Sequence, residues 1–260
     1  MKLQRRLPGY VLTLLLLSTG TSFAAHPLVS DDAGTLGKGG IQIELNGDIS
    51  TDKETVAGST AKNDGSQIAT TFGYGISDKL DVSFGIARPW GNNDLDGIKS
   101  RDPGSVDLVL GMKWQIYEND GFTVAVKPGL GYSYTVNAPD SDYATSYSAA
   151  LVLSKELEPL AFHLNVGYAY NDYNLANGLR NSIWNFSGAT TYEIVKNMKL
   201  VADIGAGTNE ESGTNNMPAF ALIGTIYTLS KNMDASVGGK IGLTRPETDF
   251  TGTFGLTFKF

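Results

Sequence analysis

The 260-residue sequence contains no cysteine, and its only two histidines are His26 and His163. A chain without cysteine has no disulfide bridges and no thiolate metal ligands, so burial and backbone pairing must stabilise it. Basic residues are also scarce, because 27 acidic side chains stand against 20 basic ones and the formal net charge is −7. Nucleic-acid-binding proteins present basic surfaces, so we expect no nucleic-acid partner.

The first residues form an export signal rather than a membrane helix. Three basic residues precede the apolar stretch VLTLLLL (11–17), and small residues follow up to Ala24. This pattern predicts a secretory signal peptide over residues 1–24, cleaved after Ala24 or, as second choice, after Ala25. No cysteine follows, which excludes a lipid-anchored lipoprotein. The segment holds three of the 20 basic residues and none of the 27 acidic ones, so the mature chain has 17 basic residues and a net charge of −10.

After the signal, no apolar run approaches the ~20 residues that a membrane helix needs. Apolar and polar residues alternate instead, as in LDVSFGI (80–86), VDLVLGMKWQI (106–116) and LAFHLNVGYAY (160–170). Successive side chains of a strand point to opposite faces, so each segment is a strand with one apolar and one polar face. We expect twelve strands, at about 40–50, 66–77, 79–90, 104–117, 121–134, 143–155, 159–172, 182–194, 197–208, 217–229, 232–244 and 249–260.

The connections between these segments are of two alternating kinds. Short turns, such as SDK around Asp78 and VKN around Lys196, carry turn-forming residues. Long polar connections, such as TDKETVAGSTAKNDG (51–65) and GNNDLDGIKSRDPG (91–104), lie between them. The repeating unit is therefore a hairpin, and one end of the molecule has tight turns while the other has longer loops.

Aromatic residues gather at both ends of the predicted strands. Trp184, Phe220 and Phe250 are among those near the long connections, and Tyr74 and Trp114 are among those near the short turns. Two aromatic girdles, an even strand number and short turns opposite long loops are typical of bacterial outer-membrane barrels. A soluble β-sandwich is the alternative, but it predicts neither the girdles nor the asymmetry of the loops.

We therefore expect an all-β fold: a transmembrane antiparallel up-and-down β-barrel of about twelve strands, formed by residues 40–260. Such a barrel belongs in the outer membrane of a Gram-negative bacterium, because a closed ring pairs all its backbone groups inside lipid. Both termini are expected on the periplasmic side.

Charged residues lie almost entirely on the polar faces of these strands. A Lys or Arg at the bilayer midplane costs ~2–4 kcal/mol on the lipid face, so the polar faces must line the lumen. Charges of both signs predict paired networks rather than a strongly ion-selective pore. The lumen-lining candidates are Glu44, Asp81, Asp107, Lys113, Lys127, His163, Glu193, Lys199, Asp203, Asp234 and Lys240, with Asp48 and Lys259 on the same faces.

The number of strands predicts a narrow lumen. About eight strands give a filled interior and sixteen or more give an open channel, so twelve are intermediate. We expect residues 25–39 to form an N-terminal periplasmic arm that packs in or under the periplasmic mouth. The connection 91–104 is a candidate for folding into the lumen, and its acidic and amide-rich tip fits solvent exposure equally well.

Three motifs suggest chemistry, and each has a plainer interpretation. GTLGKGG (34–40) contains the residues of a phosphate-binding loop, but the spacing is too short and no helix follows. His26 with Asp31 and Asp32 is a candidate metal-binding set, although one histidine and two carboxylates form a weak signal. His163 would need a serine or aspartate partner to catalyse hydrolysis, and it lies toward the short turns rather than the long loops. We expect no catalytic residue, no metal and no cofactor.

The chain ends in the segment TGTFGLTFKF (251–260), whose large apolar residues alternate with small or polar ones. This segment resembles the closing strand of outer-membrane barrels, which ends on phenylalanine and is recognised by the barrel assembly machinery. The resemblance implies that this machinery and the outer-membrane lipids are partners. The matching residues, and thus the expected assembly signal, are Phe254, Leu256, Phe258 and Phe260.

The segment HPLVSDDAGTLGKGGIQIEL (26–45) is similar to the start of an outer-membrane transporter family that carries the label meta-pathway of phenol degradation. The matching residues are His26, Pro27, Asp31, Asp32, Gly34, Thr35, Gly37, Lys38 and Gly39. The resemblance implies passive passage of small solutes, with aromatic or other hydrophobic compounds as the class, and no enzymatic activity. The alternative is a structural or adhesive barrel whose extracellular loops bind a partner.

Overall fold

The computed structural model describes residues 26–260 apart from residues 57, 138–141 and 176–177. The predicted signal peptide, residues 1–24, lies outside the described residues. Within the described part of the chain, no helix is long and apolar enough to cross a membrane. The regular elements of this part are all β-strands.

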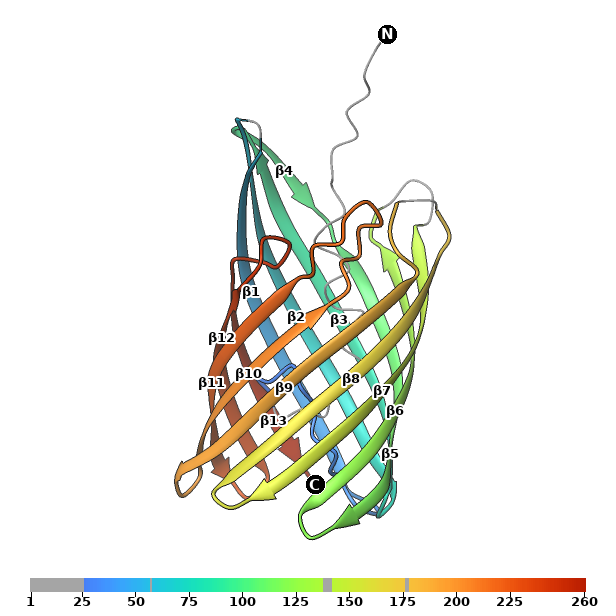
Figure 1. The fold of residues 1–260 in the computed structure, drawn as a ribbon, viewed down its shortest axis with the longest axis vertical. Helices are drawn as coiled ribbons and strands as arrows, with labels where there is room; N and C mark the ends of the chain where they lie inside the picture. The colour runs from blue at the N-terminus through green and yellow to red at the C-terminus, as the bar shows by residue number, and fades with distance from the viewer. Residues whose placement is uncertain (1–25, 57, 138–141, 176–177) are drawn as a thin grey trace.

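The described residues form thirteen antiparallel strands (Figure 1): β1 (Ile41–Val56), β2 (Ser59–Ser77), β3 (Leu80–Leu95), β4 (Ile98–Asp102), β5 (Ser105–Asn119), β6 (Phe122–Thr135), β7 (Tyr143–Leu157), β8 (Leu160–Tyr173), β9 (Ser182–Val195), β10 (Met198–Gly207), β11 (Ala219–Ser230), β12 (Met233–Gly242) and β13 (Phe250–Lys259). Twelve of them close into a ring, because β1 pairs with both β2 and β13. The remaining strand, β4, extends β3 as a hairpin and pairs with β3. The predicted all-β, up-and-down barrel of about twelve strands is confirmed.

Alternation along each strand separates a lumen face from an outer face. On β1, Glu44 is buried, whereas Leu45 and Ile49 are 43% and 60% exposed. On β13, Thr253 is buried and Phe254 is 57% exposed. An apolar outer surface of this kind needs lipid around it, and the closed ring leaves no unpaired strand edge in the bilayer. The protein is therefore a bacterial outer-membrane barrel.

The aromatic side chains on the outer face mark the two ends of the barrel. Tyr74 and Trp114 are exposed near the short turns, while Tyr132 stacks on Tyr143 near the long loops with ring centroids 5.8 Å apart. Phe220, which we predicted in the long-loop girdle, is an exception and that prediction is wrong. Its ring is buried inside the barrel. The sequence of β11 is apolar on both faces, so its pattern could not show which side chains point inward.

Five tight turns join strands at the lower end of the barrel in Figure 1, with β5–β6 and β9–β10 as examples. Asp120 and Gly121 have φ values of 49° and 68° in the first of these turns, and Asn197 has 70° in the second. Residues with positive φ match the twist of a two-residue hairpin, and Asp, Asn and Gly adopt this conformation most readily. The β1 start and the C-terminal Phe260 lie at this same end, since Ile41 and Phe260 exchange backbone hydrogen bonds of 3.1 and 2.9 Å.

Two segments that we predicted as long loops, 51–65 and 91–104, are largely strand. The β1–β2 ladder continues to Val56 opposite Ser59, and β3 continues to Leu95 before turning into β4. These extensions project beyond the ring (Figure 1), and the tip of the β3–β4 hairpin is exposed. The candidate infolding of 91–104 into the lumen is therefore wrong. Outside the bilayer a strand needs no apolar face, so the sequence there carries no alternation to reveal it.

Candidate functional site in the barrel lumen

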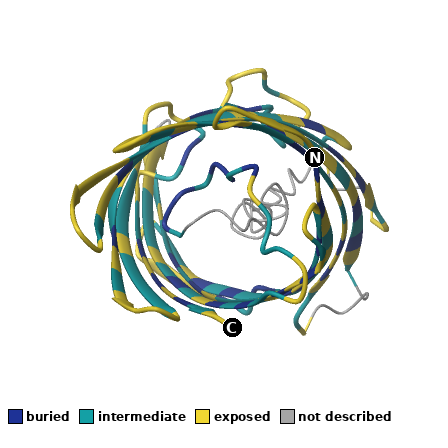
Figure 2. Ribbon diagram, turned by 90° about the horizontal axis from the view of Figure 1, so that it is seen from below, coloured by how far each residue is buried: buried dark blue, intermediate teal, exposed yellow. Residues whose placement is uncertain are grey.

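The segment that precedes β1 runs inside the barrel. Residues 26–40, which we call the arm, lie within the ring of strands when it is seen along its axis (Figure 2). Pro27, Leu28, Ser30, Asp31 and Ala33 are buried there. Residues 26–33 of the predicted arm (25–39) thus lie in the lumen. The residues after them reach the short-turn end, where Thr35 and Lys38 bond to Asp78 between β2 and β3.

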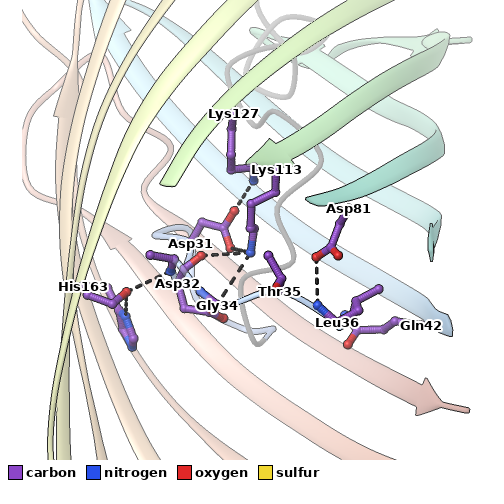
Figure 3. A network of polar contacts seen from close by, with 12 residues as sticks. Asp31, Asp32, Gly34, Thr35, Leu36, Gln42, Asp81, Lys113, Lys127 and His163 are labelled. Carbon is purple, nitrogen blue, oxygen red and sulfur yellow. Dashed lines mark hydrogen bonds and ion pairs between the residues drawn. The ribbon is translucent and has the colours of Figure 1, made fainter. Parts of the chain in front are cut away.

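Two lysines of the barrel wall hold the carboxylate of Asp31 (Figure 3). Lys113 of β5 donates to Asp31 Oδ1 at 3.0 Å and to the backbone oxygen of Asp32 at 2.9 Å. Lys127 of β6 pairs with the other carboxylate oxygen of Asp31. Asp31 and Lys113 are almost completely buried, and buried charges are tolerated only when they are paired and hydrogen-bonded. The cluster therefore fixes the middle of the arm against β5 and β6.

Asp203 of β10 anchors the preceding residues of the arm. Its Oδ2 accepts the backbone N–H groups of Val29 and Ser30 at 2.8 and 2.6 Å, and its Oδ1 accepts the Ser30 hydroxyl at 2.8 Å. Asn165 of β8 adds a reciprocal pair, accepting the Asp31 N–H at 3.0 Å and donating to the Asp31 carbonyl at 2.9 Å. Inward polar side chains thus satisfy the backbone of a segment that has no strand partner at these positions.

The first described residue, His26, is bound between β12 and β13. Its Nδ1 lies 2.7 Å from Ser236 Oγ and its Nε2 lies 2.6 Å from Thr253 Oγ1. Both ring nitrogens therefore have hydroxyl partners, while Asp31 is bound to lysines elsewhere in the lumen. His26, Asp31 and Asp32 do not converge, and the described residues contain no group of three or more metal-ligating side chains.

Glycines of the wall make room for the arm. A Cβ atom added to Gly238 would lie 2.9 Å from the ring of Pro27, and one added to Gly75 would lie 1.8 Å from the carbonyl oxygen of Gly37. Gly37 itself has a φ of 74°, and its carbonyl accepts the N–H of Gly40 at 3.1 Å. The GTLGKGG motif is thus a glycine-rich lead into β1 that packs closely on β2, and the described structure forms no helix after it.

An apolar patch inside the lumen receives Leu28 of the arm. Leu28 packs in one buried cluster with Val201 of β10 and with Phe220, Leu222 and Ile226 of β11. The inward-facing apolar residues of β10 and β11 were not foreseen from the sequence, since inward positions were expected to be polar or small. They form an apolar contact surface for Leu28, next to the polar residues that bind the arm.

The structure distributes the eleven lumen-lining candidates over three environments. Those that line a large cavity above the arm are Glu44, Asp107, Lys127 and Lys240. Those that contact the arm directly are Asp81, Lys113, Lys127 and Asp203. The remaining candidates lie on the short-turn side of the cavity. They are His163, the cross-strand neighbours Glu193 and Lys199, and Asp234, which pairs with Lys259 at 2.7 Å.

His163 has a serine partner, but in a position that serves the arm. Its Nδ1 lies 2.8 Å from Ser154 Oγ, and the same oxygen accepts the N–H of Ala33 at 2.9 Å. A serine–histidine contact of this length resembles a nucleophile–base pair. Ser154 is nevertheless buried beneath the arm, and neither residue lines the cavity. The pair therefore positions Ala33, which packs on Ala125 and Val152.

The cavity occupies the lumen between the arm and the long-loop end, with a volume of about 970 Å³. Its floor is formed by arm residues from His26 to Asp31, and its far end by Asn209, Glu210 and Arg245 from the long connections. Small residues such as Ala69 and Gly85 line much of the wall between them. The volume lies at the upper end of the range of ~300–1,000 Å³ in which proteins hold small molecules.

Solved structures that resemble the barrel are outer-membrane proteins. An outer membrane channel from Pseudomonas putida F1 aligns with a TM-score of 0.65 at 12% identity, over 88% of this chain and 98% of that one. The translocator domain of the autotransporter NalP from Neisseria meningitidis aligns with a TM-score of 0.55 at 10% identity, over 86% and 89%. The CymD monoaromatic hydrocarbon channel aligns with a TM-score of 0.51 at 11% identity, also over 86% and 89%. At such identities the likeness shows a shared fold.

Among curated proteins, none matches the sequence. A protein-family model does match, over residues 18–218 of the 260, which covers both the arm and most of the barrel. The segment from His26 to Leu45, whose resemblance we noted, lies inside the match. The chain therefore belongs to the family of outer-membrane proteins described as "Putative MetA-pathway of phenol degradation".

Proposed function

We propose that the protein is a passive channel for small solutes across the outer membrane. The observation that carries this proposal is the cavity of about 970 Å³, which extends from the long loops into the barrel and ends on the arm. A barrel that served only as a membrane anchor would gain stability by filling this space, because packed side chains contribute dispersion and burial energy. Transport would follow the solute gradient and needs no bound cofactor.

The arm lies across the proposed path at the inner end of the cavity. It crosses the lumen beside Asp203 and Lys113, and its anchors come from β5 and β6 as well as β10 to β13. A solute that leaves the cavity toward the short-turn end must pass along this segment. The arm would thus set the size limit, while the long loops would set access from outside.

Aromatic or other small hydrophobic compounds are the solute class that we favour. The family description names phenol degradation, and one structure with the same fold is named a monoaromatic hydrocarbon channel. The cavity floor fits such solutes, because Pro27, Leu28 and Phe220 present apolar surface beside the polar groups of the wall. Planar apolar molecules bind well where an apolar surface is bordered by a few hydrogen-bonding groups.

Planar-bilayer recording with the refolded barrel tests the channel function. We expect discrete conductance steps, and swelling of liposomes that contain the protein when small neutral aromatics are added outside. Lys127→Gln should change the step size, because Lys127 lines the cavity beside the arm. Lys231→Gln is the matched control, since Lys231 is exposed in the β11–β12 turn outside the cavity. A folded barrel that gives neither conductance nor swelling would overturn the proposal.

A further inference from the structure

The charges that line the cavity are strongly unbalanced. Among the described residues, the wall carries three basic side chains, namely Lys127, Lys240 and Arg245. It carries nine acidic ones, namely Asp31, Glu44, Asp48, Asp52, Glu54, Asp107, Glu210, Glu211 and Glu247. The mixture of signs that the sequence predicted holds for the lumen as a whole. It does not hold for the part that a solute would enter.

Each of the three basic side chains already has an acidic partner. Lys127 pairs with Asp31. Lys240 lies 2.8 Å from Glu247, and Arg245 lies 3.0 Å from Glu54. These pairs use three of the nine acids. The other six form no ion pair with a described residue: Glu44, Asp48, Asp52, Asp107, Glu210 and Glu211.

Two buried oxygen atoms on the same side of the cavity have no hydrogen-bond donor within the described part of the chain. Asp107 of β5 is 3% exposed; its Oδ1 accepts hydroxyl groups of Ser105 and Ser133, and its Oδ2 has no partner among the described residues. Gln67 of β2 is 9% exposed; its Nε2 donates to Asp48 at 3.0 Å, and its Oε1 likewise has no partner. Both residues line the cavity.

The strand register brings these acceptors into one band of the wall. Gln67 pairs with Asp48 on β1 and with Pro89 on β3, while Asp107 pairs with Ala87 on β3. The positions around them are small, with Ala69 opposite Ala87. The band is therefore rich in acceptor oxygens, and it lies in the wall of the cavity beside small side chains. A buried acceptor without a partner costs free energy, which a donating solute would recover.

We infer that the cavity selects cationic solutes over anionic ones. The inference rests on the proposed channel function and adds a charge class to it. A passage lined by charge of one sign raises the local concentration of counter-ions and repels ions of the same sign, and low-dielectric walls strengthen both effects. Small organic cations, with N–H groups that reach Asp107 and Gln67, are the solutes that this wall fits best. Carboxylates of the same size are the solutes that it opposes.

The test is the reversal potential of the full-length refolded barrel in a planar bilayer under a tenfold KCl gradient. The pH is about 8, well above the ordinary pKa of Asp and Glu side chains. We expect K⁺ to permeate at least about threefold better than Cl⁻. Benzylammonium chloride and potassium benzoate, as a pair of similar size, should show the same order. Asp107→Asn and the double change Glu210→Gln with Glu211→Gln should each lower the K⁺ preference.

The matched control is Asp172→Asn. It removes the same charge from an exposed position of β8 that does not line the cavity, so the K⁺ preference should stay unchanged. A conducting wild-type barrel that favours Cl⁻, or that shows no preference, would overturn this inference and leave the channel function standing. The same holds if both cavity variants keep the wild-type preference. A folded barrel without any conductance or solute uptake would instead overturn the channel function itself, and this inference with it.

Discussion

Asp31 and Lys113 are 82 residues apart in the sequence, yet the carboxylate of one lies 3.0 Å from the ammonium group of the other inside the barrel. Asp31 belongs to the arm and Lys113 to the wall, so this contact is one of those that hold the arm across the lumen. Both side chains are almost completely buried. The pair is therefore the most direct place to test what the arm does.

Asp31→Asn should loosen the arm. The change removes the carboxylate that Lys113 and Lys127 share, and removal of one partner from a buried ion pair costs about 3–5 kcal/mol. We expect a larger and noisier conductance in planar bilayers, while the barrel still migrates as a folded species in unheated gel samples. Asp32→Asn is the control: its side chain is 37% exposed and 3.9 Å from Lys113, so the change should be small. Equal effects from the two variants would contradict this account.

Gly238→Ala should displace the arm from the other side. The new methyl group would lie 2.9 Å from Pro27, whose ring cannot move away by rotating a side chain. Overpacking of this kind costs about 1–3 kcal/mol, and undocking of residues 26–29 would relieve it. Protease accessibility of the arm measures the result. The adjacent Gly239→Ala is a close control, because its Cβ would meet only Phe250, at 3.5 Å. Cleavage that rises equally in both variants would show that the arm does not depend on this contact.

Conductance should depend on pH through Glu210 in the β10–β11 connection. Burial raises the pKa of Glu210 to about 7 from its usual 4.5. The folded state thus holds this proton more tightly than the unfolded chain. The contribution of this proton to the free energy of unfolding is fully present below about pH 4.5, and it is lost as the pH rises through 7. Above that pH the cavity gains a negative charge, so the K⁺ preference should increase between pH 6 and about 8.

The variant that checks this pH effect is Glu210→Gln. It should remove the part of the pH response centred near neutrality and leave conductance otherwise similar. The measurement is the reversal potential at several pH values, alongside the thermal unfolding midpoint. A titration that persists unchanged in the glutamine variant would assign the effect to another group on the cavity wall.

Deletion of Phe260 should impair assembly. Its backbone N–H donates to the Ile41 carbonyl at 2.9 Å and its carbonyl accepts the Ile41 N–H at 3.1 Å, so it completes the seam between β13 and β1. Its ring is 69% exposed at the short-turn end, where an aromatic anchor meets the membrane interface. We expect a severalfold lower yield of folded barrel in outer-membrane fractions with export unaffected. Phe260→Tyr should assemble normally, and a normal yield after the deletion would refute the proposed assembly signal.

Removal of the β3–β4 hairpin distinguishes a channel function from the alternative function, in which the extracellular loops bind a partner. The hairpin from Asn92 to Asp102 projects past the ring, and Ile98 at its tip is 75% exposed. Replacement of residues 93–101 by a short glycine-containing turn should leave conductance unchanged, because these residues do not line the cavity. Loss of a cell-binding phenotype with intact conductance would support a second role for the loops. Loss of conductance would contradict the proposed path through the cavity.

The barrel could be predicted from the sequence because lipid imposes a rule on every second residue. Leu45 and Ile49 must face hydrocarbon while Glu44 cannot, so the pattern of β1 determines both strand and orientation. The rule fails where lipid is absent. The extensions of β1 to β4 carry no apolar face, and β11 carries apolar residues on both, which is why Phe220 was placed on the wrong side.

The contacts of the arm could not be predicted from the sequence. The segment carries the family resemblance, and its position in or under the periplasmic mouth was expected, but the wall residues that bind it were not. Asp203 and Asn165 are inward-facing polar residues like many others, and the local sequence does not distinguish an arm anchor from a free lumen residue. Only the tertiary structure selects among them, because each contact joins segments more than 130 residues apart. The glycines at 224 and 238 gave no signal either, since glycine is frequent throughout the barrel.

The arm also has a mechanical consequence. Each strand of the ring is held only by its two neighbours, so a ring of this size resists stretching along its circumference better than flattening across its width. The arm contacts Lys113 of β5, Asp203 of β10 and Thr253 of β13, so it connects distant parts of the circumference across the lumen. Lateral pressure from the bilayer should therefore flatten the barrel less than it would flatten a ring without these contacts.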